Sequence, residues 1–383
     1  MSWESGESMI SDAVQKAAAV VGGRKSLTVL VNDPQRHTDT ATVLARLAGH
    51  FDPTKTRILV ATGTHSFPSA AREQYQLQVQ GGRQYADFAW HDCRSDKLVP
   101  IGHDASWLGH PWLLGDGGLL AIGSVEPHYF AGFTGAHKTC TIGVAAYEEI
   151  EANHSAAMGP LCQPCKLAGN PIYEGVAAML SGLEALRPVA AVNLVQSGRR
   201  VLAAFGGRPV ESLQEAACVA RQAFTRTIPR QSDALVLDVA GALGVSFYQA
   251  DKGIKNNEWA VRSGGVIVLQ APCPDGIGQD HFVSLLLEAP GYDQARAVVA
   301  ARGYRLGDHK AVRLRYLTDD QYRGVRVYIV SDGLSPEHAG VLGFTKATSA
   351  EHAMAHAGLR ADDCNICTIP DAGNMVVTVQ PAV

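Results

Sequence analysis

The chain has 383 residues, of which 46% are hydrophobic and 18% charged, and its formal net charge at pH 7 is −4. A chain of this length is expected to form two domains, and its near-balanced charge gives no electrostatic reason to expect nucleic acid or an anionic membrane as a partner. The sequence contains no apolar run long enough to cross a membrane and no recognisable signal peptide, so we expect a cytoplasmic protein.

Apolar runs typical of strands alternate with helical patterns through the first half of the chain. The predicted strands lie at 26–33, 56–61, 116–125 and 188–197, and the predicted helices at 8–22, 39–51, 69–79, 145–158 and 167–187. Polar residues follow several of these strands directly. This order of elements is typical of an open α/β sheet.

The second half of the chain shows the same alternation after a polar, proline-containing stretch at 221–233. Its predicted elements, with a loop at 244–261 among them, lie at 234–241, 264–278, 282–289, 292–303, 325–332, 349–359 and 364–373. We therefore predict an α/β fold of two α/β domains, residues 1–228 and 229–369, with the active site in the cleft between them. The last residues, 370–383, could return to the first domain as an added strand.

Four polar residues of the first half fall where ligands collect in such a sheet, at the carboxyl ends of the strands. They are Asp33, Arg36, His65 and His128. Two histidines in analogous loops suit general acid–base catalysis near neutral pH, although a single histidine is more often structural. The planar guanidinium of Arg36 suits a carboxylate ligand, and an ordinary surface arginine is the alternative.

The stretch 126–154 combines histidines with a lysine in a glycine-rich loop. Lys138 lies ten residues after His128 and sixteen before His154, which falls on a predicted helix. An amine in such a loop can contact phosphate or form a covalent bond, and a solvated lysine is the alternative. The loop does not match the phosphate-binding pattern of P-loop proteins, and no strand is followed by the dinucleotide-binding glycine pattern.

A polar group follows the first strand of the second domain. Tyr248, Gln249 and Lys252 come after a glycine-containing loop, and Gln249 and Lys252 are candidates to point into an interdomain cleft. Lys255 and Glu258, a little further on, are interpreted equally well as solvated charges or as functional residues.

Eight cysteines include two pairs with CxxC spacing, Cys162 with Cys165 and Cys364 with Cys367. The four thiolates would suit zinc only if the fold brought the distant pairs together, and the first pair alone resembles a redox motif. Reduced cysteines without a shared function are the simpler interpretation.

Taken in order, these motifs resemble the lactate racemase family of nickel-pincer enzymes. The residues that carry the resemblance are Asp33, Arg36, Thr62, Gly63, His65, His128, Lys138, His154, Tyr248, Gln249 and Lys252. They extend over about 220 residues, and each motif is weak alone. Their shared order and spacing make the resemblance specific.

The resemblance implies a cofactor and a reaction. The cofactor would be the nickel-pincer nucleotide, a pyridinium-3-thioamide-5-thiocarboxylic acid mononucleotide tethered to Lys138, with Ni(II) bound also by His154. The enzyme would be a racemase or epimerase that inverts C2 of a 2-hydroxy acid by hydride transfer to and from this cofactor. His65 and His128 would be the paired acid–base residues.

Further roles follow from the same resemblance. Substrate would be held by Arg36, Tyr248, Gln249 and Lys252, and Asp33 would orient Arg36 or contact the cofactor. Hydride transfer avoids the carbanion that a histidine would have to form at a carbon beside an ionised carboxylate. The partners implied are a small 2-hydroxy acid and the enzymes that make the cofactor, and homo-oligomerisation is left open.

The sequence departs from the family at two positions that contact substrate or cofactor in its members. Many lactate racemases have a serine where this chain has Ala131, and a late tryptophan where none follows Trp259. We therefore expect a larger or more polar 2-hydroxy acid than lactate, such as malate, a sugar acid or an aryl-lactate. His137, beside Lys138, replaces a smaller residue and has no assigned role.

Two other functions remain open at this point. One is a non-catalytic protein that binds hydroxy acids on the same scaffold. The other is a zinc hydrolase that uses His65, His128 and His154, although the chain lacks the HExxH motif.

Overall fold

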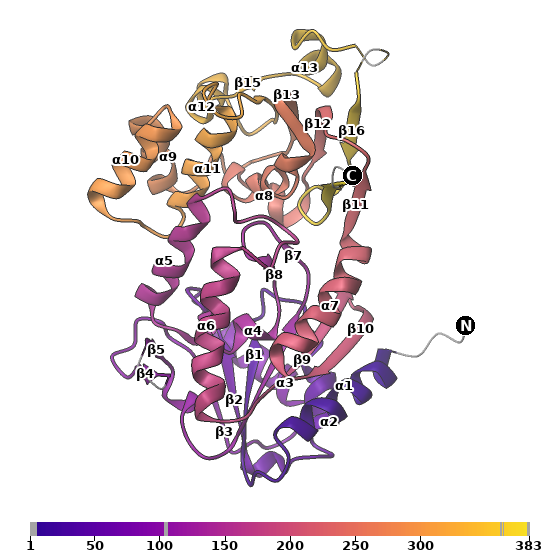
Figure 1. Cartoon of the computed structure of the whole chain (residues 1–383), viewed down its shortest axis with the longest axis vertical. Helices are drawn as coiled ribbons and strands as arrows, with labels where there is room; N and C mark the ends of the chain where they lie inside the picture. Colours follow the sequence, from indigo (N-terminus) through magenta and orange to yellow (C-terminus); the bar gives the residue numbers. More distant parts are fainter. Residues whose placement is uncertain (1–5, 103–105, 361, 363, 381–383) are drawn as a thin grey trace. The chain divides into compact units, whose positions relative to one another are not determined.

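The structure is a computed structural model that describes the chain except for residues 1–5, 103–105, 361, 363 and 381–383. The chain forms two compact units (Figure 1). The first comprises Met1–Asn153 and Cys165–Ala223, and the second comprises His154–Pro164 and Phe224–Val383. The prediction of an α/β protein with two domains is confirmed.

The first unit is built on a six-stranded sheet in the order β10-β9-β6-β1-β2-β3. All neighbours are parallel except β10, which runs antiparallel to β9. The strands are β1 (Leu27–Asn32), β2 (Thr56–Ala61), β3 (Asp87–Trp90), β6 (Gly118–Ser124), β9 (Val189–Ser197) and β10 (Arg200–Gly207). The sequence did not indicate β3 and β10, which lie at the two edges.

Seven helices belong wholly or mainly to the described part of this unit. They are α1 (Gly6–Val20), α2 (Thr40–Leu47), α3 (Ser69–Gln80), α4 (Ala136–Thr139), α5 (Tyr147–Ser155), α6 (Pro171–Leu186) and α7 (Pro209–Phe224). Helix α2 begins at Asp39, whose carboxylate accepts a hydrogen bond from the Thr42 amide, and α6 begins with Pro171 after an Asn170 cap. Both are favourable helix starts.

Short elements complete the first unit. They are β4 (Val99–Ile101), β5 (Trp107–Gly109), β7 (Pro127–His128), β8 (Gly132–Phe133) and the 3-10 turns η1 (Pro53–Lys55), η2 (Pro111–Leu113) and η3 (Ile142–Val144). The central strands are buried on both faces, which explains why their sequences are continuously apolar. Val29, Val31, Ile58 and Val60 pack in one buried cluster with residues of α1, α2 and α3.

The strand order fixes where a ligand can bind in this unit. From β1 the chain moves to β2 and β3 on one side, and it later returns to β6 on the other side of β1. Such a reversal opens a crevice at the carboxyl ends of the two central strands. The register pairs Asn32 with Ala61 and Leu30 with Ala121, so the loops after all three strands leave at the same edge.

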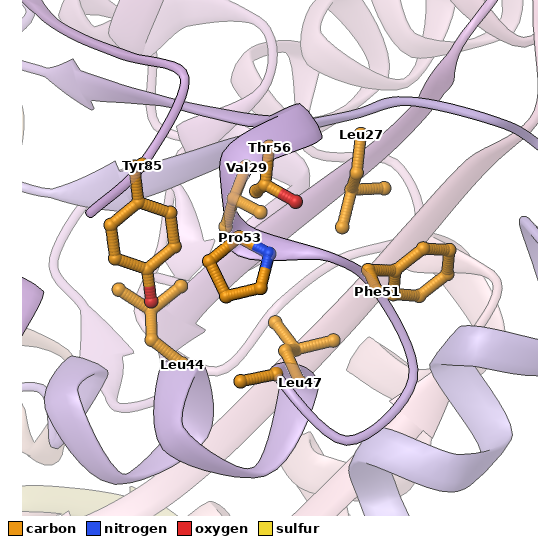
Figure 2. Close-up of a pocket in the computed structure, with 9 residues that line it drawn as sticks. Leu27, Val29, Leu44, Leu47, Phe51, Pro53, Thr56 and Tyr85 are labelled. Atoms are coloured by element: carbon orange, nitrogen blue, oxygen red, sulfur yellow. The ribbon is translucent and has the colours of Figure 1, made fainter. Parts of the chain in front are cut away.

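A small apolar pocket lies at the opposite end of the sheet, at the amino ends of β1 and β2 (Figure 2). Leu44 and Leu47 of α2 line it together with Leu27, Phe51 and the ring of Tyr85. Burial raises the pKa of the Tyr85 hydroxyl. The lining is that of a packing defect under a helix, remote from the polar loops.

The second unit is built on a five-stranded parallel sheet in the order β15-β14-β13-β12-β16. Its strands are β12 (Ser232–Asp238), β13 (Val261–Gln270), β14 (Arg326–Val330), β15 (Thr345–Lys346) and β16 (Ile366–Ile369). Its helices and turns are η4 (Ala156–Met158), η5 (Gly241–Gly244), α8 (Phe247–Asn257), η6 (Glu258–Ala260), α9 (Asp280–Glu288), α10 (Tyr292–Arg302), α11 (Asp308–Thr318), α12 (Pro336–Leu342) and α13 (Ala350–His356).

Two sequence-based expectations are wrong in this unit. The predicted loop at 244–261 contains helix α8, whose Phe247 and Ile254 are buried; its glycine and two asparagines had weakened the helical pattern. For the last residues, an added strand of the first domain was considered. Instead β17 (Val376–Val379) pairs in parallel with β11 (Thr225–Ile228), both in the second unit.

The reason for the second error lies in specific contacts. The amide of Val377 donates to the side chain of Asn257, and the Asn257 amide group donates in turn to the Met375 carbonyl. These bonds hold β17 against α8. The end of helix α7 and strand β11 occupy most of 221–228, the first part of the polar stretch at which the sequence indicated a domain boundary.

Candidate active site

Asp33 and His65 form a hydrogen-bonded pair at the carboxyl edge of the first sheet. Asp33 directly follows β1 and is 5% exposed, and its Oδ2 lies 2.8 Å from Nδ1 of His65, which follows β2. The second oxygen, Oδ1, accepts a bond from the Gln35 amide. The carboxylate therefore holds the proton of the neutral imidazole on Nδ1 and leaves a lone pair on Nε2. In the structure Asp33 orients His65, whereas the sequence suggested Arg36 or the cofactor as its contact.

Arg36 contacts a residue that sequence reasoning did not single out. Its guanidinium lies 2.7 Å from the carboxylate of Glu126, across the point where the sheet order reverses. Both side chains are about two-fifths exposed. The sequence did contain a signal for Glu126, because it is an acidic residue two positions before His128 and just after strand β6. Guanidinium has five N–H donors, so Arg36 can bind a second carboxylate while it is paired.

His128 lies in the short hairpin of β7 and β8 with its ring among aromatic neighbours. It stacks on Tyr129 at 5.2 Å and meets the edge of Phe130 at 4.4 Å between ring centroids. The amide of Ala131 donates to its Nδ1 at 3.3 Å. A neutral His128 therefore has its proton on Nε2, which is the tautomer opposite to that of His65.

Lys138 lies on α4, and its environment differs from that of a solvated lysine. Its Nζ lies 5.7 Å from the centre of the Phe130 ring. Burial, with a contribution from the charge of Arg36, lowers the pKa of the Lys138 amine to about 7. About half of the molecules then have an unprotonated, nucleophilic amine at neutral pH.

Two asparagine side chains fasten α4 to the sheet. The Thr139 hydroxyl donates to Asn32 at the end of β1, and the Ala136 amide donates to Asn193 of β9, both at 2.8 Å. A Cβ at Gly123 of β6 would lie 2.4 Å from the Ala136 nitrogen, so the helix packs directly on that strand. Sequence reasoning missed these residues, although an asparagine inside the apolar run 189–195 was a visible signal.

His137 lies behind the lysine and is 2% exposed. Its Nδ1 has no hydrogen-bond partner among the residues that the structure describes, and its ring lies 5.9 Å from that of Tyr173. Burial, with a contribution from Lys138, lowers the pKa of His137 to about 3. The ring is therefore neutral and adds no positive charge beside the amine.

His154 lies in the last turn of α5, and it belongs to the second unit. The following turn, η4, packs on α11. Burial, with a contribution from His154, holds the pKa of His309 on α11 well below its ordinary value. His154 thus has a neutral histidine near it in the second unit.

The three remaining predicted residues lie on the first turns of α8. Tyr248 and Lys252 are partly buried and Gln249 is exposed. The helix follows β12, beside the second point where a sheet order reverses, between β12 and β16. This is the position at which open α/β sheets bind ligands.

Lys255 and Glu258 are not solvated charges, so that interpretation is wrong. Their side chains are 0% and 4% exposed and form an ion pair of 3.1 Å, and Arg313 of α11 also pairs with Glu258. Although burial opposes the effect, Lys255 and Arg313 lower the pKa of Glu258. The polar sequence of α11 hid this arrangement, because a helix with buried charges has no apolar stripe.

The cysteines do not form the zinc site considered from the sequence. All eight are free thiols, and Cys162 and Cys165 fall in different units. Within the described residues, no group of three or more histidine, cysteine or acidic side chains is arranged to hold a metal ion. The described helices also include none that is both long and apolar enough to span a membrane.

Comparison with known proteins adds relatives in sequence and in structure. Residues 5–161 match the lactate racemase N-terminal domain and residues 230–377 match the lactate racemase C-terminal domain. The lactate racemase of Thermoanaerobacterium thermosaccharolyticum is 26% identical over 376 residues, covering 93% of this chain and 85% of the relative. That of Lactiplantibacillus plantarum is 25% identical over 387 residues, covering 96% and 88%.

Solved structures show the same fold. The lactate racemase apoprotein of T. thermosaccharolyticum superposes with a TM-score of 0.84 at 22% identity, covering 98% of this chain and 93% of the other. A protein from Thermotoga maritima superposes with a TM-score of 0.69 at 15% identity, covering 98% of both chains. Fold and matched domains define a two-domain α/β protein of the racemase type. The chain belongs to the lactate racemase family.

Proposed function

We propose that the protein is a 2-hydroxy acid racemase or epimerase that uses a nickel-pincer nucleotide attached to Lys138. The observation that carries the proposal is the Lys138 amine, whose pKa is lowered to about 7 by burial and by Arg36. A partly unprotonated amine is the form that attacks an electrophilic carbon. Family membership and the names of the two curated relatives support the same reaction.

The surroundings of Lys138 fit a covalently held nucleotide. Helix α4 is fixed by Asn32 and Asn193, so the amine is presented from a rigid element. When bound, the cofactor would accept and return a hydride and would bring Ni(II), for which imidazole is a suitable ligand. In this proposal His154 is that ligand.

His65 and His128 would move the hydroxyl proton of the substrate. Asp33 leaves the Nε2 lone pair of His65 ready to take a proton, and it stabilises the imidazolium that results. Neutral His128 has its proton on Nε2 instead, because the Ala131 amide donates to its Nδ1. His128 can accept a proton on Nε2 only after its ring proton has moved to Nδ1 and this bond has been released.

Arg36 and Lys252 would hold the substrate carboxylate, with Tyr248 and Gln249 beside it. The names of the relatives point to lactate as one candidate substrate. Ala131 is buried and lacks the serine hydroxyl that many relatives have at this position, so we propose a 2-hydroxy acid other than lactate as the preferred substrate. Enzymes that mature the cofactor are the partners this function requires.

Intact-mass spectrometry tests the cofactor. Protein produced together with the maturation enzymes should gain an adduct of mononucleotide size, and Lys138→Ala should lose it. Lys166→Ala is the matched control, because Lys166 lies in the same unit outside α4 and should keep the adduct. If the wild type gains no mass under these conditions, the proposed cofactor is wrong.

Inversion of a panel of 2-hydroxy acids by the loaded protein tests the reaction. We expect one acid of the panel to lose its optical purity, with nickel present in the purified protein. An adduct without inversion of any acid would instead indicate a non-catalytic hydroxy-acid-binding protein.

A further inference from the structure

The second unit buries a cluster of charges that the proposed function does not yet use. Its members lie on α8, on the turn that follows it and on α11, and each is at most 8% exposed: Asp251, Lys255, Glu258, Lys310 and Arg313. Buried charges are costly unless they are paired or bind a ligand. The contacts of these five side chains therefore show which charges are paired with each other and which have another role.

Glu258 accounts for two of the cations. Lys255 pairs with it at 3.1 Å, and Arg313 pairs with its other oxygen. This pairing ties the end of α8 to α11. Loss of one partner would leave a buried charge without compensation, so these three residues have a structural role.

Lys310 instead contacts the first turn of α8. Its Nζ donates to the Tyr248 carbonyl at 2.5 Å and lies 4.1 Å from the centre of the Tyr248 ring. Cation–π contact of this kind favours one position of the ring. Lys310 thus holds both the backbone and the side chain of Tyr248.

Gly307, just before α11, also contributes to the surroundings of the Tyr248 side chain. A Cβ at Gly307, where φ is +105°, would lie 2.8 Å from the Tyr248 hydroxyl and 2.7 Å from Nε2 of His281. The glycine therefore leaves the space that the tyrosine hydroxyl occupies. The ring also packs against Phe282, with 5.4 Å between centroids.

Asp251, on the same turn, indicates that the cluster is electrostatically incomplete. Both of its carboxylate oxygens are buried and have no hydrogen-bond partner among the described residues. Burial raises the pKa of Asp251, against the opposing charges of Lys255 and Lys310. Three cations, Lys255, Lys310 and Arg313, act on Asp251 beside one other acid, Glu258, so an excess of one positive charge favours an anionic ligand at this turn.

We propose that Lys310 is a positioning residue for substrate: it fixes the first turn of α8 so that Tyr248, Gln249 and Lys252 can bind a carboxylate. The inference rests on the proposed function, which assigns substrate binding to that turn. Lys310 acts through Tyr248 and adds positive charge behind it. Its loss should weaken the binding of a 2-hydroxy acid more than it slows the reaction.

The test compares KM and kcat of loaded protein for the acid that the wild type inverts. Lys310→Met keeps the aliphatic bulk and removes the charge, and we expect KM to rise about tenfold or more with kcat within about threefold. Lys310→Arg should restore most of the affinity. Lys346→Met is the matched control, because Lys346 also donates to a backbone carbonyl of this unit, that of Leu334, and should leave KM unchanged.

A second variant reaches the same turn without a change of charge. Gly307→Ala places a methyl group where the Tyr248 hydroxyl lies, so KM should rise here too. Thermal unfolding of each variant establishes that it is folded. A folded Lys310→Met or Gly307→Ala protein with the KM of the wild type would overturn the role of Lys310. A wild type that inverts no acid would overturn the proposed function and this inference together.

Discussion

The two units place their polar residues differently around similar sheets. In the first unit Asp33, Arg36 and His65 follow the strands, and Arg36 and His65 are well exposed in loops. In the second unit the charges of α8 and α11 lie behind the sheet edge, almost wholly buried. Similar topology thus places the groups proposed for catalysis in loops of one unit, and buries charged side chains on helices in the other.

The difference follows from which elements supply the side chains. Loops after parallel strands can present polar groups to solvent, whereas a helix that packs on a neighbour buries whatever its inner face contains. An exposed ion pair contributes little to stability, and a buried one is costly to break. The comparison therefore predicts that substitutions of polar residues in the first unit mainly change reaction rates. Substitutions of the buried charges in the second unit should mainly change the free energy of unfolding.

A large effect is expected for the reactivity of Lys138 in apoprotein. Because its pKa is lowered to about 7, its amine is about half unprotonated at pH 7, where an ordinary lysine is unprotonated in roughly one molecule in a thousand. Brief treatment with an amine-specific acylating reagent at pH 7, followed by peptide mass spectrometry, should label Lys138 about 500-fold faster than Lys166. The acylation rate of Lys138 should level off above about pH 8, while the acylation rates of the other lysines continue to rise with pH. Equal rates at both lysines would contradict the lowered pKa.

Removal of the histidines tests the chemistry of the first unit. His65→Ala and His128→Ala should each reduce kcat by about 100-fold to 10,000-fold, the range of general acid–base catalysis, with little change in thermal unfolding. His37→Ala, a change at an exposed histidine, is the control. Activity that survives in the double variant would remove the two-base mechanism.

Glu258→Gln tests the burial of charge in the second unit. The change removes the partner of both Lys255 and Arg313 and should reduce the free energy of unfolding by about 3–5 kcal/mol. Denaturant titration of apoprotein measures the difference. A loss below about 1 kcal/mol would mean that the pair is solvated in solution.

Glu126→Gln gives the matched change in the first unit and the smallest expected effect. Its ion pair with Arg36 is about two-fifths exposed, so the loss of stability should be below about 1 kcal/mol. Released from Glu126, Arg36 should bind the substrate carboxylate at least as well, and KM should not rise. A large loss of stability would mean that the two units do not differ as described.

Much of the fold was predictable because buried parallel strands have continuous apolar sequences. The central strands β1, β2, β6 and β9 were found in this way, while the edge strands β3 and β10 were not. Helix α11 was invisible for a physical reason: it buries charged side chains together with apolar ones, so its sequence shows no separate apolar face. Helix α8 was hidden by the glycine and asparagines that let it contact β17.

The candidate site was predictable where chemistry depends on residue type and local spacing. His65, His128 and Lys138 were identified from their loops, and the structure adds their partners. Glu126, Asn193 and Lys310 were not identified, because each acts through a contact with a residue far away in the sequence. Such contacts leave no local pattern.

The pairing of β11 with β17 has a consequence for how the chain folds during synthesis. All strands of the first sheet precede residue 208, so that unit can begin to form its core while the rest of the chain is still being made. The second unit pairs its first strand with its last described strand, about 150 residues apart, and so this pairing cannot form until Val379 has been made. Until β17 has been made, Asn257 of α8 lacks its hydrogen-bond partners at Met375 and Val377.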